Sequence, residues 1–85
     1  MIGAAMATYH LTHRHAPGEC VTAFAAWHGF DSPLRGKPTI SSCLEGGHRV
    51  WWRLEASSPD EALSALPAFV AERTEAEEIR EVVIP

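Results

Sequence analysis

Two adjacent glycines, Gly46 and Gly47, constrain this 85-residue chain more than any other feature of its sequence. They separate two strand-like segments, 39–44 and 49–55. A glycine pair adopts the positive φ angles of a two-residue hairpin turn without steric cost. We therefore expect a tight hairpin here, and its register predicts which side chains of the two strands share a face.

With the glycines in the turn, Cys43 opposes Val50, and directly opposed residues share a face of the sheet. The more apolar face is expected to pack against helices, and it carries Tyr9, Leu11, Ser41, Cys43, Val50, Trp52 and Leu54. The other face carries His10, Thr12, Ile40, Ser42, Leu44, Arg49, Trp51 and Arg53. A register slip of one residue would exchange the two sets, because side chains alternate with a period of two.

The remaining segments alternate between strand and helix patterns. Residues 8–13 alternate as a strand, and residues 19–28 place apolar side chains at helical spacing. A second helix is expected over residues 59–73, interrupted at Pro67 because proline cannot continue a helix without a kink. The last segment, 77–84, is expected to be a strand.

The element order is therefore β-α-β-β-α-β. It predicts an α+β fold class in the ferredoxin-like arrangement, with a four-stranded antiparallel sheet and two helices on one face. Right-handed crossovers are expected to place the strands 8–13 and 49–55 side by side and parallel, with the other two at the edges. A single domain is expected over residues 6–85, with 1–5 as a disordered extension and Met6 as an alternative start.

The composition excludes several classes of function. A net charge of −4 argues against sequence-independent nucleic-acid binding, and no apolar run approaches the ~18 residues of a membrane span. Without an export signal, the two cysteines are expected as reduced thiols in the cytoplasm. Because so short a chain has a thin core, a second copy is a natural source of extra burial. We therefore expect a homodimer through the bare sheet face. The residues expected at that interface are His10, Arg49, Trp51 and Arg53.

The predicted topology gathers polar residues at one edge of the sheet. Strand 8–13 ends where the first helix begins, which places His13 near Cys20. In the first turn of a helix the pKa of a thiol tends to fall, so Cys20 and His13 form a candidate catalytic nucleophile and base. The end of strand 49–55 and the helix cap Ser58 are expected at the same edge, where two helix N-termini would favour an anion. Alternatively, Cys20 is a core residue and His13 a hydrogen-bonded residue at a strand end.

The same topology argues against a metal site. A structural zinc ion needs four ligands that converge within ~2.3 Å of the metal. His15 and Cys20 are expected at one edge, whereas His48 in the hairpin is expected at the opposite edge. No metal and no other cofactor are therefore expected within one subunit, and a metal that bridges two subunits stays an alternative. His15 and His28 are expected to face solvent.

Aromatic and polar side chains share the helix-facing side of the sheet. A small core seldom takes so many polar groups unless something pairs with them, which favours a ligand cavity between sheet and helices. The alternative is that the aromatic cluster is core only. The candidate ligand-binding residues are Tyr9, Phe24, Trp27, Ser41, Cys43 and Trp52.

With this element order, the glycine pair 46–47, the tryptophan pair 51–52 and the closing segment 81–85, the chain resembles the dimeric α+β barrel superfamily. Its members include muconolactone isomerase-like proteins, small monooxygenases of antibiotic pathways and many uncharacterised short bacterial proteins. The resemblance implies a dimer whose sheets pack face to face, with a pocket between sheet and helices in each subunit. It covers residues 8–84 and transfers no catalytic role to any of them.

Two functions are expected from these patterns. The first is a cofactor-independent isomerase, cyclase or monooxygenase that acts on a small organic acid or aromatic compound, with His13 as base and Tyr9 or Cys20 assisting. The second is a non-catalytic homodimeric module that binds a small molecule or a partner. The sequence leaves open whether the protein is an enzyme.

Overall fold

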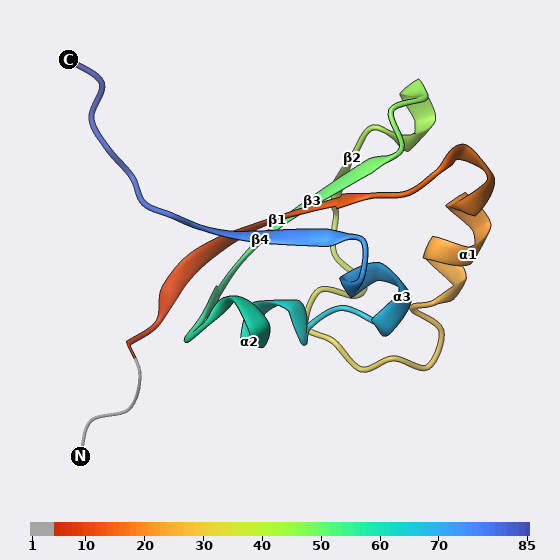
Figure 1. The fold of residues 1–85 in the computed structure, drawn as a ribbon, viewed down its shortest axis with the longest axis horizontal. Coiled ribbons are helices and arrows are strands. Elements are labelled where there is room, and N and C mark those ends of the chain that lie inside the picture. The colour runs from red at the N-terminus through yellow and green to blue at the C-terminus, as the bar shows by residue number, and fades with distance from the viewer. Residues whose placement is uncertain (1–4) are drawn as a thin grey trace.

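The computed structural model describes residues 5–85 and is an α+β fold built on one four-stranded antiparallel sheet. The strands are β1 (Ala7–Arg14), β2 (Ile40–Ser41), β3 (Arg49–Ala56) and β4 (Thr74–Ile79), in the order β2-β3-β1-β4. The helices are α1 (Cys20–Ala25), α2 (Pro59–Leu63) and α3 (Ala68–Ala71), and they lie on one side of the sheet (Figure 1). Most of the predicted extension, residues 1–4, lies outside the described residues.

The neighbours of the central strands are as predicted, but their direction is not. β1 and β3 lie side by side and run antiparallel, with Ala7 opposite Ala56 and Arg14 opposite Arg49. The expectation of a parallel pair is wrong because β3 is one hairpin further along the chain than β2. The crossover from β1 restores the strand direction in β2, and the hairpin then reverses it in β3. The start of β3 therefore lies beside the end of β1.

The β2–β3 register differs from the predicted one by two residues. Ser41 pairs with Val50, whereas a two-residue turn would have placed it opposite Trp52. Because side chains alternate with a period of two, the paired residues of β2 and β3 keep their predicted faces. Tyr9 and Leu11 lie on the helix-facing side of the sheet and are buried, as expected.

A longer turn than predicted connects β2 to β3. Its first part is a 3-10 helix over Cys43–Glu45, which ends at Gly46 with φ 85°. A Cβ atom on Gly47 would collide with the side chain of Ser42, so the close approach of the backbone requires glycine there. His48 has φ 53°, a left-handed conformation that is uncommon for residues other than glycine. The glycine pair thus makes the turn, within a wider loop.

The core lies between the sheet and the helices α2 and α3. Its buried members are Tyr9, Leu11, Ala56, Ala62, Leu66 and Val70. Trp52 and Leu54 of β3 pack against them, so the predicted helix-facing side of the sheet is confirmed. Among the described residues, none of the helices is long and apolar enough to cross a bilayer.

The predicted second helix begins and breaks where the sequence indicates. The backbone N–H of Glu61 donates to Oγ of Ser58 at 3.1 Å, which caps α2. Pro67 separates α2 from α3 and is the N-cap of α3, with an extended ψ of 154°. The first helix is shorter than the predicted 19–28, since α1 ends at Ala25 and continues only as turns.

The final strand is displaced toward the N-terminus. β4 spans Thr74–Ile79 rather than 77–84, and Val82, Val83 and Ile84 are exposed. β4 pairs only with β1, and its last pair joins Ile79 to Thr8, next to the first residue of β1. Beyond that pair the described part of the chain offers no neighbouring strand, so the apolar tail leaves the sheet (Figure 1).

Candidate functional site

The antiparallel pairing brings the β2–β3 turn beside the segment that joins β1 to α1 (Figure 1). The backbone N–H of His15 donates to the carbonyl of His48 at 3.2 Å, which continues the β1–β3 ladder by one bond. His48 therefore does not lie at the opposite edge from His15 and Cys20, as the sequence led us to expect. The geometric reason for excluding a four-ligand metal site is wrong.

Four potential metal ligands converge at this end of the sheet: His15, Cys20, Cys43 and His48. One ligand atom of each lies within 4.8 Å of all the others. Nε2 of His15 lies 3.3 Å from Sγ of Cys20 and 3.6 Å from Sγ of Cys43. Nδ1 of His48 lies 3.0 Å from Sγ of Cys20. We call these four side chains the His/Cys cluster.

His13 contacts His15 of the cluster from the interior of the protein and is only 1% exposed. Its Nδ1 is 3.3 Å from the carbonyl oxygen of Val70 and 3.2 Å from Oγ1 of Thr74. The Thr74 hydroxyl donates its own proton to the Val70 carbonyl, at 2.6 Å. Both partners of Nδ1 are therefore acceptors, so Nδ1 of His13 carries the proton.

The other ring nitrogen of His13 extends this chain toward the cluster. Nε2 of His13 lies 2.9 Å from Nδ1 of His15. Because Nε2 has no proton in this tautomer, it accepts from Nδ1–H of His15, and Nε2 of His15 keeps a free lone pair. That lone pair faces the two sulfur atoms. Both ring nitrogens of His13 are thus engaged within the protein.

The surroundings favour neutral imidazoles in both buried histidines. Burial, together with the neighbouring His15, lowers the pKa of His13, against the opposing effect of the Val70 carbonyl. Burial and the nearby His48 lower the pKa of His15. The expectation that His15 faces solvent is wrong, because the close pairing of β1 with β3 covers it, whereas His28 is exposed as expected.

The predicted pair of Cys20 and His13 is not a direct contact, because His15 lies between them. Partial burial and the neighbouring Cys43 raise the pKa of the Cys20 thiol, whereas a fall was expected from the helix N-terminus. The second helix N-terminus that we expected at this edge lies elsewhere. Ser58 follows the far end of β3, where Ala56 pairs with Ala7.

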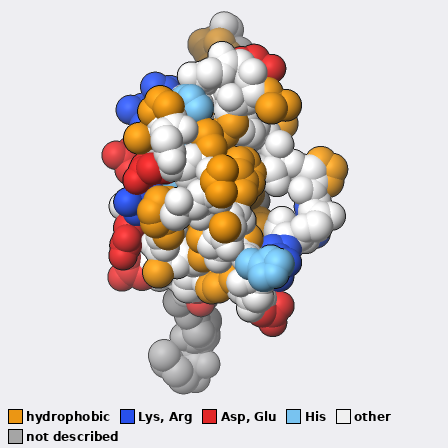
Figure 2. Space-filling model, turned by 90° about the vertical axis from the view of Figure 1, so that its right-hand side faces the viewer, with side chains coloured by type: hydrophobic (Ala, Val, Ile, Leu, Met, Phe, Trp, Pro, Cys, Tyr) orange, Lys and Arg blue, Asp and Glu red, His pale blue; other side chains and the backbone are white. Residues whose placement is uncertain are grey.

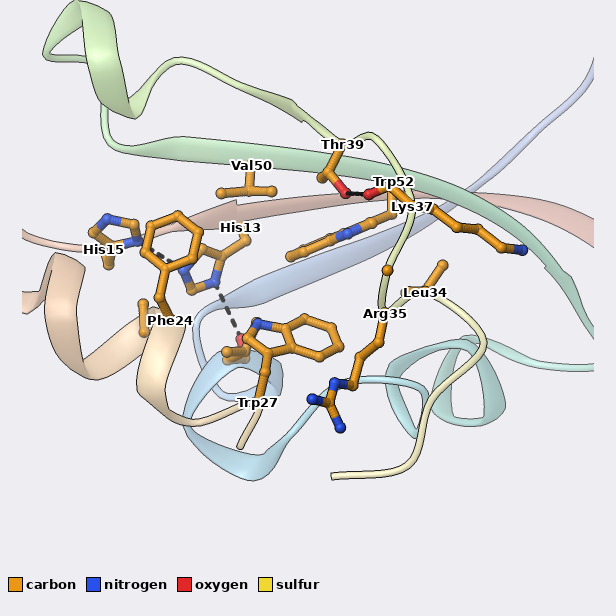
Figure 3. Close-up of a pocket in the computed structure, with 13 residues that line it drawn as sticks. His13, His15, Phe24, Trp27, Leu34, Arg35, Lys37, Thr39, Val50 and Trp52 are labelled. Atoms are coloured by element: carbon orange, nitrogen blue, oxygen red, sulfur yellow. Dashed lines mark hydrogen bonds between the residues drawn. The ribbon is translucent and has the colours of Figure 1, made fainter. Parts of the chain in front are cut away.

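A cavity of about 260 Å³ adjoins the cluster between the sheet and the helix layer (Figure 3). Trp27 and Trp52 contact each other, with ring centroids 5.7 Å apart and planes at 50°, and together form one aromatic wall. His13 and His15 line its inner end, so the cavity and the His/Cys cluster share one histidine.

The mouth of this cavity is partly apolar. Phe24 lines the cavity although it is 58% exposed, so it stands at the opening rather than in the core stripe expected from helical spacing. Val21, on the same helix, is also exposed. Figure 2 shows the side of the molecule where α1 lies, and hydrophobic side chains gather over its middle.

The structure divides the six predicted ligand-binding residues into two groups. Phe24, Trp27 and Trp52 line the cavity. The other three do not: Tyr9 is part of the core, Ser41 is exposed, and Cys43 belongs to the His/Cys cluster. Tyr9 lies too far toward the other end of β1, and the longer turn carries Cys43 out of the strand.

Sequence reasoning missed the loop that supplies the cavity's outer rim. Leu34, Arg35, Lys37 and Thr39 all line it, and they belong to the irregular segment between α1 and β2. No periodicity marks such a segment, so no pattern indicated which of its residues border the cavity. The adjacent positive charges of Arg35 and Lys37 were the available signal.

No protein-family model matches the chain, and no curated protein or solved structure is significantly similar to it. The chemistry of the site itself is therefore the basis for a function.

Proposed function

We propose that this protein is a binding module for a small aromatic or organic acid, held in the cavity between sheet and helices. The observation that carries the proposal is the composition of the cavity wall. Trp27 and Trp52 offer aromatic faces, and the rim residues Arg35 and Lys37 add positive charge nearby. The Arg35 guanidinium donates to the Phe30 carbonyl at 3.0 Å, and the Lys37 amine extends into solvent away from the two indoles (Figure 3). Among the described residues that line the cavity, none is acidic. An apolar ring with an attached carboxylate matches both features.

The size of the cavity narrows the class of ligand. Its volume of about 260 Å³ is just below the ~300–1,000 Å³ typical of sites for drug-sized molecules. A cavity of roughly 150 Å³ is large enough to hold benzene. The ligand is therefore a compound with one substituted ring or a short organic acid of equal bulk.

Binding is favoured over catalysis by the state of the polar groups. His13, the expected base, uses one ring nitrogen toward Val70 and Thr74 and the other toward His15. Cys20, the expected nucleophile, is not among the residues that line the cavity. A general base needs a free nitrogen within hydrogen-bond reach of the substrate. The non-catalytic alternative therefore accounts better for this site.

Tryptophan fluorescence tests the proposal in a Trp51→Phe background, which removes the one indole on the opposite face. Benzoate is expected to change the emission of Trp27 and Trp52 at micromolar to low millimolar concentrations. The double variant Arg35→Ala and Lys37→Ala should weaken benzoate binding but leave binding of the neutral benzyl alcohol unchanged. An emission that stays constant with both probes up to millimolar concentration would contradict the proposal.

We also infer that the protein is a homodimer through the sheet face opposite the helices. Pairing places His10 between Arg53 of β3 and Glu77 of β4 on that face. On this face β3 carries Arg49 and Arg53, with Glu55 at its end, whereas β4 carries Glu75 and Glu77, so mostly basic β3 and acidic β4 flank β1. A two-fold axis parallel to β1 would lay acidic β4 of one copy over basic β3 of the other. This self-complementary charge pattern supports the dimer.

The strand order and the uncovered face also support the ferredoxin-like arrangement and the dimeric α+β barrel as the architecture of this dimer. Native mass spectrometry of Arg53→Glu should show mostly monomer, and adding Glu77→Arg should restore the dimer. Glu81→Arg, beyond the end of β4, is the matched control and should change nothing. A wild-type chain that stays monomeric at tens of micromolar would contradict the inference.

A further inference from the structure

We propose that His15, Cys20, Cys43 and His48 bind one Zn²⁺ ion per chain in a tetrahedral Cys2His2 centre. The proposal goes beyond the ligand cavity and stands independently of it. Two thiolates and two imidazoles form a donor set that Zn²⁺ prefers in structural sites. The four donor atoms already converge, with none more than 4.8 Å from another.

The distances between the donors fit a tetrahedron around zinc. Zn–S bonds of about 2.3 Å and Zn–N bonds of about 2.0 Å imply donor-to-donor edges of roughly 3.3–3.8 Å. The two edges from His15 Nε2 to the sulfur atoms of Cys20 and Cys43 are 3.3 and 3.6 Å. The edge from Cys20 to His48 is 3.0 Å. The remaining edges are no longer than 4.8 Å, so shifts of up to about an ångström bring all four donors onto a tetrahedron.

The hydrogen-bond chain behind the cluster presets the ligating nitrogen. The Val70 carbonyl fixes the proton on Nδ1 of His13, and Nε2 of His13 then fixes the proton on Nδ1 of His15. Nε2 of His15 is left as a lone pair that points at the sulfur atoms. Zinc-bound histidines almost always donate their other ring N–H to such an outer partner. His13 is therefore a positioning residue for His15.

The donors of the cluster make more close contacts than they have protons to share. The single lone pair on Nε2 of His15 is approached by two sulfur atoms, those of Cys20 and Cys43. Cys43 can donate its S–H to that lone pair while Cys20 donates to Nδ1 of His48, and the 3.3 Å contact between His15 and Cys20 is then left without a proton. A cation in the middle would engage all of these contacts at once, because each donor then directs a lone pair inward.

The sequence supplies the four ligands as two similar arms. His15 and Cys20 are separated by four residues, and so are Cys43 and His48. The second arm holds His48 at φ 53°, a strained conformation for a residue other than glycine. Such strain persists where the surrounding structure requires it, and here it turns the imidazole back toward Cys20.

The centre is closed and therefore structural. Four protein ligands complete the tetrahedron and leave no position for water or substrate. The ion would join the end of β1, the start of α1 and the β2–β3 turn. The helices and strands in this part of the chain are otherwise short. Since His15 also lines the cavity, the metal would fix the inner wall of the proposed binding site.

Titration with Co²⁺ under reducing conditions tests the site without relying on any variant. Tetrahedral Co²⁺ with two thiolates gives visible d–d bands and a sulfur-to-metal charge-transfer band. We expect both, saturating at one ion per chain, and we expect Zn²⁺ to displace Co²⁺ and abolish the colour. A folded, reduced protein that gives only the pale spectrum of hexahydrated Co²⁺, or saturates at one ion per two chains, would overturn the proposal.

Variants then assign the ligands. Cys43→Ser should lower the charge-transfer intensity by about half or abolish binding, and His48→Gln should weaken binding at least tenfold. His28→Gln, an exposed histidine outside the cluster, is the matched control and should bind as the wild type does. Circular dichroism verifies folding for each variant. Wild-type affinity in a folded Cys43→Ser variant, or a loss in His28→Gln as large as in His48→Gln, would contradict the assignment.

Discussion

The two ends of the sheet are stabilised by different chemistry. At the end where β3 leads into α2, Ala56, Ala62 and Leu66 are buried in an apolar core. At the end where β1 leads into α1, the buried side chains include His13 and His15, beside two cysteines and a third histidine. The first end is held by removal of apolar surface from water, and the second by polar groups that bond to one another.

The size of the surrounding elements explains why the second end is built in this way. α1 has six residues and contributes a single buried side chain, Ala23. β2 has two residues, and the turn after it exposes Leu44. Such short elements bury too little apolar surface to order themselves, so another source of stability is needed. The proposed zinc centre is that source.

The largest effect is expected from removing the metal. If Zn²⁺ at a thousand times its Kd stabilises the folded chain by about 4 kcal/mol, chelation lowers Tm by roughly 15–30 °C. Hydrogen exchange should rise first in residues 15–28 and 39–49, and last in 56–71. Differential scanning fluorimetry and exchange mass spectrometry measure the two effects. Equal increases in hydrogen exchange at both ends of the sheet would contradict the division into an apolar end and a metal-stabilised end.

The next largest effect is expected at the opposite end. Leu66→Ala removes a side chain that is 3% exposed and should cost about 2–5 kcal/mol of unfolding free energy. Because Leu66 supplies neither a ligand nor a hydrogen bond to the cluster, the affinity for Co²⁺ should stay within twofold of the wild-type value. Urea denaturation and Co²⁺ competition measure these quantities. A tenfold loss of metal affinity would show that the two ends are not independent.

A smaller effect is expected from substitution of His13, which bonds to the ligand His15. His13→Phe keeps the ring but removes the acceptor for Nδ1–H of His15, and should weaken Zn²⁺ binding by about 10–100-fold. His13→Gln restores an acceptor and should recover part of the affinity. Competition with a chromophoric chelator measures both. If the two variants bind Zn²⁺ equally well, His13 fills space and does not position His15.

The smallest effect is expected at the start of α2. Ser58→Ala removes the side chain that accepts from the N–H of Glu61 and should cost about 1 kcal/mol, with no change in metal affinity. Ser58→Asp retains a capping acceptor and is the matched control. Thermal unfolding in the presence of Zn²⁺ checks the difference. A Tm equal to that of the wild type would show that this end does not depend on the cap.

Local features of the fold could be predicted well from the sequence. The faces of β1 and β3 follow from alternation with a period of two, and they survived a two-residue error in register. The start of α2 and the break at Pro67 follow from capping and from the geometry of proline. These features depend only on neighbours along the chain, so one sequence is enough to find them.

Prediction of the candidate site depended on one non-local relation, namely whether β3 runs parallel or antiparallel to β1. With the wrong direction, His48 lay at the far edge and the zinc ligands could not meet. The repeated spacing of His15 with Cys20 and of Cys43 with His48 was the signal in the sequence that these four residues belong together. The cavity rim, with Arg35 and Lys37, lies in an irregular loop whose path no local pattern predicts.

X-ray absorption at the zinc edge is the decisive measurement for the proposed metal centre. It uses the full chain loaded with one equivalent of Zn²⁺ and reports the ligand atoms without a crystal. We predict two sulfur ligands at about 2.3 Å and two imidazole nitrogens at about 2.0 Å. A first shell made of oxygen and nitrogen alone, or a six-coordinate ion, would contradict a zinc centre at this end of the sheet.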